Sequence, residues 1–441
     1  MSTRSLPVAN LQLPRFRSVL DRLGVEQLAV STKWTRRRCR KIRAFDLVLS
    51  FCTMAFDGGG SLLQLAVGVA LSGICRPSRQ GVWKRVNGQL VDLLCSLVER
   101  GMCEAADQAV CLLGGVLFSA FPEVFLQDST CAHLPKSLAD SFPGNGNKAG
   151  RSAVAKLDVL LELKSWRLAR LLVKPFSSGD QLEAVPALAH MRAGALVIRD
   201  LGYFTTNSME EVALSGCFFL TRLKFGVGIM LPDGSALELG SMLRKRNRLD
   251  LQVLVGSRKV PARLVAVPVG RALAEQRRRK AAQDRDRRVN HSQEYMRRLG
   301  WTLLLTNVDA ETWTPGQAVQ AYRHRWQIES MFKSWKSYLG VGGYPQALKD
   351  GRPEKFEAVV MAQLLLVVTV LMPILRLCHL RQRQQGLQVS ISNLKLAMLI
   401  KMAVHANPEQ QMWIEQNIEY YCKYDKRRRK NAVQVLMEPL S

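Results

Sequence analysis

Acidic residues are scarce in this chain. Of its 441 residues, 36 are Asp or Glu and 63 are Lys or Arg, which gives a formal net charge of +27 and a pI near 10.1. A polyanion is therefore the expected partner, and no lipid-anchor motif points to a membrane surface instead. The excess of basic residues is concentrated in three runs, 36–43, 277–288 and 426–430. Each run alone could be a solvated surface, but the three together favour a nucleic acid partner.

The chain also lacks the patterns of a zinc protein, a disulfide scaffold and a secreted protein. None of its ten cysteines forms a C-x-x-C pair or a Cys/His group with zinc spacing, and most lie in apolar runs, as reduced thiols do. The first sixteen residues contain no apolar signal core. The most apolar stretch, 359–375, is interrupted by Gln363, Thr369 and Pro373, which favours a buried helix over a membrane span. We expect a soluble cytoplasmic protein without a membrane partner.

The spacing of apolar residues predicts a mixed α/β chain with helical ends. Helical patterns cover 46–56, 61–73 and 81–100, and residues 72–86 resemble a helix-turn-helix. Strand patterns follow at 123–130, 155–163, 166–174, 194–204 and 216–225, with a helix candidate at 181–191. Two more strands (249–256 and 262–270), a basic helix (271–298) and a strand (301–308) precede a helix that opens near Pro315.

Four polar residues in the run YRHRWQIESMFKSWK stand out. Tyr322, Arg325, Glu329 and Lys336 have offsets of 0, 3, 7 and 14. On one continuous helix they would fall within roughly 60° of each other, beside an apolar seam. Such a stripe could be only a solvated charged face. A carboxylate flanked by phosphate-binding groups also suits metal-assisted chemistry on a nucleic acid.

Two aspartates follow apolar strand patterns. Asp128 comes after VFLQ, and Asp200 comes after ALVIR and precedes LGYF. Aspartate often starts a turn, but the end of a strand is also the usual position of chemistry in α/β sheets.

Together these motifs resemble a known family. The spacing Y-x2-R-x3-E-x6-K is the signature of bacterial DDE transposases of the insertion-sequence-four family, and QDST around Asp128 and DLGY around Asp200 resemble that family's two aspartate motifs. The resemblance extends from about residue 45 to 400. It implies a ribonuclease-H-like catalytic core with a β-rich insertion domain, flanked by helical N- and C-terminal domains. It also implies that Asp128, Asp200 and Glu329 are catalytic and bind Mg2+, with Mn2+ as a substitute.

The resemblance further implies where DNA binds. Tyr322, Arg325 and Lys336 are expected to contact phosphates, and Trp301, 28 residues before Glu329, corresponds to a base-stacking tryptophan of members that form hairpin ends. Trp301 could equally be a core aromatic. The basic helix adds four DNA-binding candidates, Arg277, Arg278, Arg279 and Lys280.

The expected domains are a helical DNA-binding region (1–115), the first part of the core (116–225), the insertion with the basic helix (226–300), the second part of the core (301–345) and a helical region with a basic tail (346–441). The predicted function is a DNA transposase that cuts and joins double-stranded DNA at transposon ends and target, acting as a homodimer in the synaptic complex and associated with the nucleoid. Two alternatives remain: a metal-dependent nuclease that does not join, and a non-catalytic regulator of transposition.

Overall fold

The structure is a computed structural model that describes residues 15–35, 42–56, 61–73, 75–107, 116–147, 150–283, 291–338, 340–341 and 352–377, and a few single residues between 404 and 416. Two of the predicted basic runs therefore lie mostly or wholly outside the described residues (36–43 and 426–430), as does most of the predicted C-terminal region.

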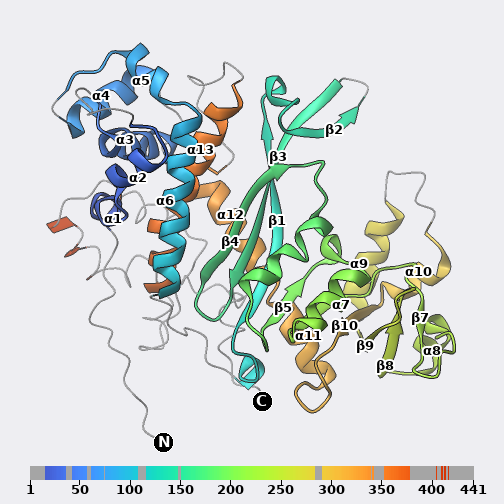
Figure 1. Ribbon diagram of the computed structural model, residues 1–441. Coiled ribbons are helices and arrows are strands. Elements are labelled where there is room, and N and C mark those ends of the chain that lie inside the picture. Colours follow the sequence, from blue (N-terminus) through green and yellow to red (C-terminus); the bar gives the residue numbers. More distant parts are fainter. Residues whose placement is uncertain are drawn as a thin grey trace, which may run out of the picture.

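One mixed sheet of ten strands runs through the middle of the protein (Figure 1). The order is β2-β3-β1-β5-β6-β10-β9-β8-β7, and β4 pairs with β3 off this path. Only the β1–β5 and β5–β6 pairs are parallel. The strands are β1 Val124–Leu134, β2 Pro143–Asn147, β3 Gly150–Glu162, β4 Arg167–Pro175, β5 Leu196–Arg199, β6 Phe218–Arg222, β7 Ile229–Met230, β8 Leu249–Val255, β9 Val260–Pro268 and β10 Trp301–Thr306.

Helices cover both faces of the sheet. The N-terminal helices pack around α13, which contacts α3 and α6 (Figure 1). These elements are α1 Phe16–Arg22, α2 Val25–Ser31, α3 Ala44–Phe56, α4 Leu62–Ser72, α5 Arg79–Arg85, α6 Gly88–Asp107 and α13 Pro353–Leu366. The remaining helices are α7 Thr206–Leu214, α8 Leu239–Lys245, α9 Arg271–Ala282, α10 Gln293–Arg298, α11 Pro315–Arg323 and α12 Trp326–Tyr338. Short 3-10 turns include η4 Asp180–Glu183, η5 Pro186–His190 and η6 Leu201–Tyr203.

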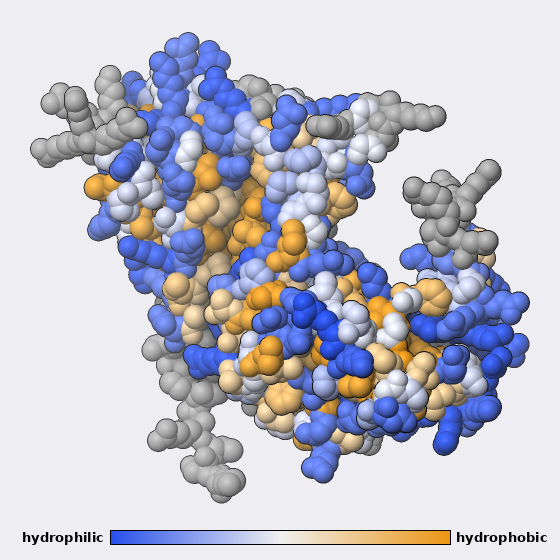
Figure 2. Space-filling view, turned by 45° about the vertical axis from the view of Figure 1, so that its right-hand side comes forward, coloured by the Kyte–Doolittle hydropathy of each residue, from blue (hydrophilic) through white to orange (hydrophobic). Residues whose placement is uncertain are grey.

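Alternation along the strands produces two hydrophobic cores. Val124 and Leu126 of β1 belong to the core that α11, α12, α13 and the N-terminal helices share, whereas Phe125 belongs to the core on the other face, with α7 and α8. β5 is apolar at three successive positions and buried throughout, as a central parallel strand must be. In the space-filling view the outline is bent, and hydrophilic residues cover the outer ends of both arms (Figure 2).

The strands of the predicted insertion belong to this same sheet. β9 pairs with β10 from Trp301↔Pro268 to Thr306↔Arg263, and β8 and β7 follow outward. Their inner side chains, such as Val253 and Leu264, join the second core. The mixed α/β architecture with flanking helices is thus observed, and a separate unit at 226–300 remains a prediction.

Three predicted helices were wrong in detail. Residues 181–191 form the two short 3-10 turns η4 and η5 instead, and Pro186 is the first residue of η5. The pattern at 81–100 divides into α5 and α6, where Asn87 caps the new helix by accepting from Leu90 N (3.1 Å). The basic helix 271–298 comprises α9 and α10, and Ser292 caps the second of these through Tyr295 N.

The apolar stretch near residue 365 is a core helix, as predicted. The helix Pro353–Leu377 is long and apolar enough to cross a membrane, but 89% of its most apolar window is buried inside the protein. A π-helical turn at Val367–Leu371 precedes Pro373, which has no N–H to donate within the helix, and the helix continues to Leu377.

Candidate active site

The parallel pairing of β1 with β5 brings two aspartates together. The last paired residues are Gln127 and Arg199, so Asp128 and Asp200 are the next residue of each strand. Asp128 shares the face of Val124 and Leu126, which is the face that α12 covers. Asp200 directly follows β5, as the sequence predicted.

The position of Asp128 needs a correction, because β1 does not end there. The strand continues to Leu134, paired throughout with β3, and Asp128 lies opposite Val159. The parallel neighbour β5, however, ends at Arg199, so the β5 side of Asp128 faces the turn that follows Asp200. The Asp128 carboxylate accepts a hydrogen bond from Ser129 N (2.8 Å).

A tight turn holds Asp200. Its Oδ1 accepts from Gly202 N (2.7 Å), which makes Asp200 the cap of η6. A Cβ at Gly202 would come within 3.0 Å of Asp200 Oδ1 and 3.2 Å of Asp180 Oδ2, so the position has little room for a side chain. This packing gives a physical reason for the glycine in DLGY.

The predicted continuous helix from Tyr322 to Lys336 is wrong. α11 ends at Arg323 and α12 begins at Trp326. Between them the backbone tightens to i→i−3 hydrogen bonds, such as Arg325 N to Tyr322 O (3.1 Å). The buried side chains of His324 and Gln327 contact each other across this junction (Nδ1 to Nε2, 3.0 Å).

Arg325 lies in this junction and joins two of the carboxylates. Its Nη1 donates to Asp128 Oδ2 at 3.3 Å, and its Nη2 is 2.6 Å from Glu329 Oε1. Glu329 on α12 therefore approaches Asp128 on β1 through one shared guanidinium. The side chains are 13% exposed for Asp128 and 32% for Glu329, so the site is open to solvent from the helix side.

Electrostatics also place the three carboxylates together. Burial raises the pKa of Asp128 to about 7, and the charges of Asp200 and Glu329 act in the same direction, against Ser129 N–H and Arg325. Converging carboxylates repel, so the ionised site calls for a cation.

The donor chemistry of this site fits a divalent metal. Three carboxylates offer the hard oxygen ligands that Mg2+ and Mn2+ prefer. Within the described ranges, however, no group of three His, Cys, Asp or Glu side chains stands close enough to hold an ion. The Arg325 guanidinium lies between two of the three carboxylates, 3.3 Å from Asp128 and 2.6 Å from Glu329.

Comparison with known proteins decides the family. The family described as "Transposase DDE domain" matches residues 119–342, about half of the chain, including all three carboxylates. The chain belongs to this DDE transposase family.

Curated relatives agree with this assignment. The chain is 24% identical over 360 residues to the transposase for insertion sequence element IS231E of Bacillus thuringiensis subsp. finitimus, covering 75% of this chain and 73% of the relative. It is 25% identical over 347 residues to that of IS231F of Bacillus thuringiensis subsp. israelensis (72% and 71%). A putative transposase InsL of Escherichia coli (strain K12), for IS186A, is 37% identical over 107 residues, which is 24% of this chain and 28% of the relative. The protein is thus a DNA transposase.

Two more residues of the transposase signature lie close to the carboxylates. Burial raises the pKa of Tyr322 to about 12, and Arg325, Arg222 and Asp200 all influence it, so the phenol lies among them. Lys336 donates to Cys131 O of β1 (2.8 Å) and is exposed. Arg222, at the end of β6, was not predicted as a site residue, although the predicted strand 216–225 contained it.

The two tryptophans differ in exposure. Trp301 begins β10 as predicted and packs partly into the second core. Trp326 directly follows Arg325, is 51% exposed, and has Lys333 Nζ 5.2 Å from its ring centre. The sequence prediction missed Trp326, because only its exposure distinguishes it from a core aromatic.

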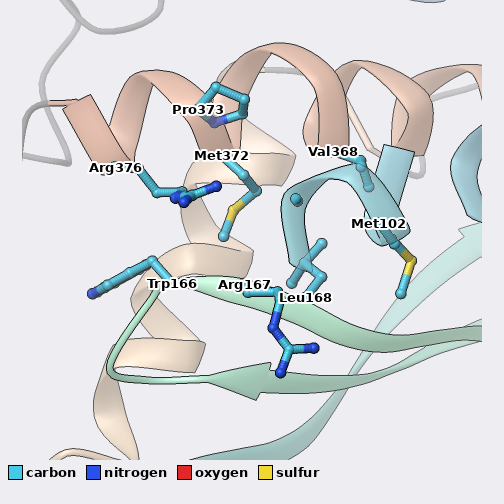
Figure 3. A pocket seen from close by; sticks show the side chains of 9 residues that line it. Met102, Trp166, Arg167, Leu168, Val368, Met372, Pro373 and Arg376 are labelled. Carbon is cyan, nitrogen blue, oxygen red and sulfur yellow. The ribbon is translucent and has the colours of Figure 1, made fainter. Parts of the chain in front are cut away.

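The four basic candidates of α9 also differ. Arg277 donates to Leu299 O and Trp301 O, and Arg278 donates to Met296 O, so both hold α10 and β10 in place. Arg279 and Lys280 are exposed. The carboxylate site is separate from the pocket between α6, the β3–β4 turn and the helical segment 368–376 that follows α13, which Trp166, Arg167 and Arg376 line (Figure 3). None of the predicted site residues lines that pocket.

Proposed function

We propose that Asp128, Asp200 and Glu329 form the metal-binding catalytic triad of this transposase. The supporting observation is that Arg325 lies between Asp128 of β1 and Glu329 of α12, while Asp200 directly follows β5, the parallel neighbour of β1. A pair of divalent ions, most simply Mg2+ with Mn2+ as a substitute, supplies activation of the attacking oxygen and stabilisation of the leaving oxygen. The protein's part is to hold the three carboxylates ionised on one side of the scissile phosphate.

The proposed DNA contacts surround this centre. Arg325 would exchange its carboxylate partners for a phosphate, which a guanidinium binds with two parallel hydrogen bonds. Lys336 acts as a point charge beside β1, and Tyr322 donates a hydrogen bond to a phosphate. Arg279 and Lys280 are the members of the basic helix that can follow the DNA backbone.

Trp326 is a second candidate, beside Trp301, for a residue that stacks on a base. Stacking on an extruded base requires an accessible ring face, and Trp326 is about half exposed beside Arg325. A fluorescent base analogue at the cleaved end distinguishes them: Trp326→Ala should reduce its quenching more than Trp301→Ala. A larger effect of Trp301→Ala would return that role to Trp301.

At the level of the molecule we propose end binding by the helical region 1–115, an insertion at 226–300 between the two core parts 116–225 and 301–345, and a C-terminal region 346–441. Two ends brought together imply a homodimer on DNA. Cut-and-paste chemistry proceeds by hydrolytic nicking, attack by the freed 3′-hydroxyl, possible hairpin formation and transfer into target DNA. The expected place of action is the bacterial nucleoid.

Cleavage of a duplex that carries the element's own ends tests the triad. Glu329→Gln keeps the size of the side chain and removes its charge, and Glu311→Gln on an exposed loop is the matched control. We expect cutting by the wild type and the control with Mg2+ or Mn2+, and a loss of at least about 100-fold in Glu329→Gln while end binding persists. Equal cutting by all three proteins would remove Glu329 from the triad.

The alternatives give different products. A nuclease of the same fold cuts the labelled ends but never joins them to target DNA, whereas a regulator binds the ends without cutting under any metal condition. A strand-transfer assay with pre-cleaved ends therefore separates both from a transposase.

A further inference from the structure

The face of the sheet opposite the carboxylates carries a buried polar network. Each catalytic aspartate follows a polar residue that points to this other face: Gln127 before Asp128 and Arg199 before Asp200. Arg199 Nε donates to Gln127 Oε1 (2.8 Å), and both residues are almost completely buried. This hydrogen bond thus links β1 and β5 at the residues that directly precede the two aspartates.

Asp158 of β3 is the centre of the network. Its side chain is fully buried and lies on β3 opposite Ser129. It accepts hydrogen bonds from Tyr203 Oη (2.5 Å) and Gln127 Nε2 (3.3 Å), and Arg170 Nη1 is 3.4 Å away. Because Tyr203 is the third residue after Asp200, its hydroxyl anchors the turn that carries Asp200 to the strand beside β1.

Asp180 makes a second link between the same segments. Its Oδ1 accepts from Ser129 Oγ (3.1 Å) and from Lys156 Nζ (2.9 Å). Its Oδ2 lies 3.2 Å from the position that a Cβ would take at Gly202. Asp180 therefore contacts the residue after Asp128 and the turn after Asp200.

Stability alone is a poor reason for this arrangement. A fully buried carboxylate carries a large desolvation cost, and well-packed apolar residues at such positions are often at least as stable. The network's contacts instead meet at the residues next to the two aspartates. Groups of this kind orient metal-binding side chains in other proteins, where their loss weakens metal affinity by about 10–100-fold.

We propose that Tyr203 and Asp158 are positioning residues that fix Asp200 relative to Asp128, so that their hydrogen bond sets the affinity of the carboxylate site for divalent metal. This inference rests on the proposed function of Asp128 and Asp200.

Mn2+ binding to the full-length, DNA-free protein tests the proposal through the electron paramagnetic resonance signal of free Mn2+. Tyr203→Phe removes only the hydroxyl and is expected to weaken Mn2+ binding about tenfold while the circular dichroism spectrum stays unchanged. Tyr295→Phe, at a half-buried tyrosine of α10, is the matched control and should bind as the wild type does. Unchanged Mn2+ affinity in folded Tyr203→Phe would overturn the proposal.

Asp158 provides a second series. Asp158→Asn keeps an oxygen that can accept from Tyr203 and should retain most of the affinity, whereas Asp158→Ala should lose about as much as Tyr203→Phe. The double variant Tyr203→Phe/Asp158→Ala should lose no more than Asp158→Ala alone, because the hydrogen bond that Tyr203→Phe removes is already absent in Asp158→Ala. Additive losses, or equal effects of Asn and Ala, would count against a positioning role. A fall in unfolding temperature without a change in Mn2+ affinity would do so as well.

Cleavage gives an independent readout. Tyr203→Phe should raise the Mn2+ concentration for half-maximal cleavage about tenfold and leave the rate at saturating Mn2+ within about threefold of the wild type. Asp200→Asn separates this proposal from the function on which it rests. If Asp200→Asn binds Mn2+ normally, the ligand assignment itself fails. If Asp200→Asn loses Mn2+ and Tyr203→Phe does not, only the positioning role fails.

Discussion

At the scale of single residues, Arg325 is the positive charge that the described structure places between Asp128 and Glu329. It lies 3.3 Å from an Asp128 oxygen and 2.6 Å from a Glu329 oxygen, and its side chain is only 20% exposed. A bound metal ion and Arg325 therefore both neutralise the negative charge of the same two carboxylates. We infer that they compete, and that DNA phosphate gives Arg325 its alternative partner.

This competition predicts how metal changes stability. Arg325→Ala leaves the carboxylates facing each other, so the protein without added metal should lose about 1–2 kcal/mol, which lowers the unfolding temperature of a chain of this length by about 1–2 °C. Added Mn2+ should then raise the unfolding temperature more in Arg325→Ala than in the wild type. Arg323→Ala, at the exposed end of α11, is the control. Equal Mn2+-induced shifts in all three proteins would contradict the competition.

Gly202 is a second residue with a testable role, because the turn leaves almost no room for a Cβ atom at this position. In Gly202→Ala the new methyl group would press on the carboxylates of Asp200 and Asp180, both about 3 Å away. We expect cleavage at subsaturating Mn2+ to fall at least tenfold. Gly179→Ala, where a Cβ meets no atom within 4 Å, should be neutral in the same assay. Wild-type cleavage by Gly202→Ala would mean that the turn can yield.

The junction between α11 and α12 is the most informative feature at the scale of elements. No proline or glycine lies between Tyr322 and Lys336, so the pattern of side chains predicted one helix. The break depends on the buried contact of His324 with Gln327 and on the packing of His324 against Phe118, with ring centres 5.2 Å apart. Those partners come from tertiary structure, which a local pattern cannot indicate.

His324 makes this junction sensitive to acid. Burial lowers its pKa from 6.5 to about 4, so between these values the unfolded state binds more protons and stability falls as the pH falls. At pH 5 the loss should reach about 2 kcal/mol relative to pH 7. Urea unfolding at both pH values should show that His324→Gln loses this part of the pH dependence. His133→Gln, at an exposed histidine of β1, should keep it, and equal pH dependence in both variants would contradict the assignment.

Other elements show the same division between what patterns reveal and what they miss. Apolar runs located β5, β6, β8, β9 and the β3–β4 hairpin, because burial leaves a direct mark on composition. The continuation of β1 beyond Thr130 to Leu134 was not predicted, because it depends on pairing with β3. Asp158 and Lys156 on β3 also read as solvent-facing by alternation. They are buried because η4 and η6 cover them, and these turns are specified by contacts distant in sequence.

At the scale of the whole molecule, α13 packs against the N-terminal helices α3 and α6. Lys355 of α13 is buried, and its Nζ donates to Trp83 O (2.8 Å) and to Val86 O at the end of α5. The ammonium also lies 3.9 Å from the centre of the Trp83 ring. The Lys355 ammonium thus caps the carbonyl groups at the end of α5, although it comes from a helix about 270 residues later in the chain. The orientation of the proposed DNA-binding helices therefore depends on α13, at the start of the proposed C-terminal region.

Lys355→Met tests this dependence. The substitution leaves the two carbonyls at the end of α5 without the ammonium, which should cost about 1–3 kcal/mol. Amide hydrogen exchange should accelerate in residues 79–86 more than in the central sheet, and affinity for the transposon end should fall while Mn2+ binding at the carboxylates stays unchanged. Lys84→Met removes an exposed charge from the same helix and should weaken DNA binding only through its salt-dependent part. If both variants lose end binding equally, with no change in exchange at α5, Lys355 contributes charge rather than orientation.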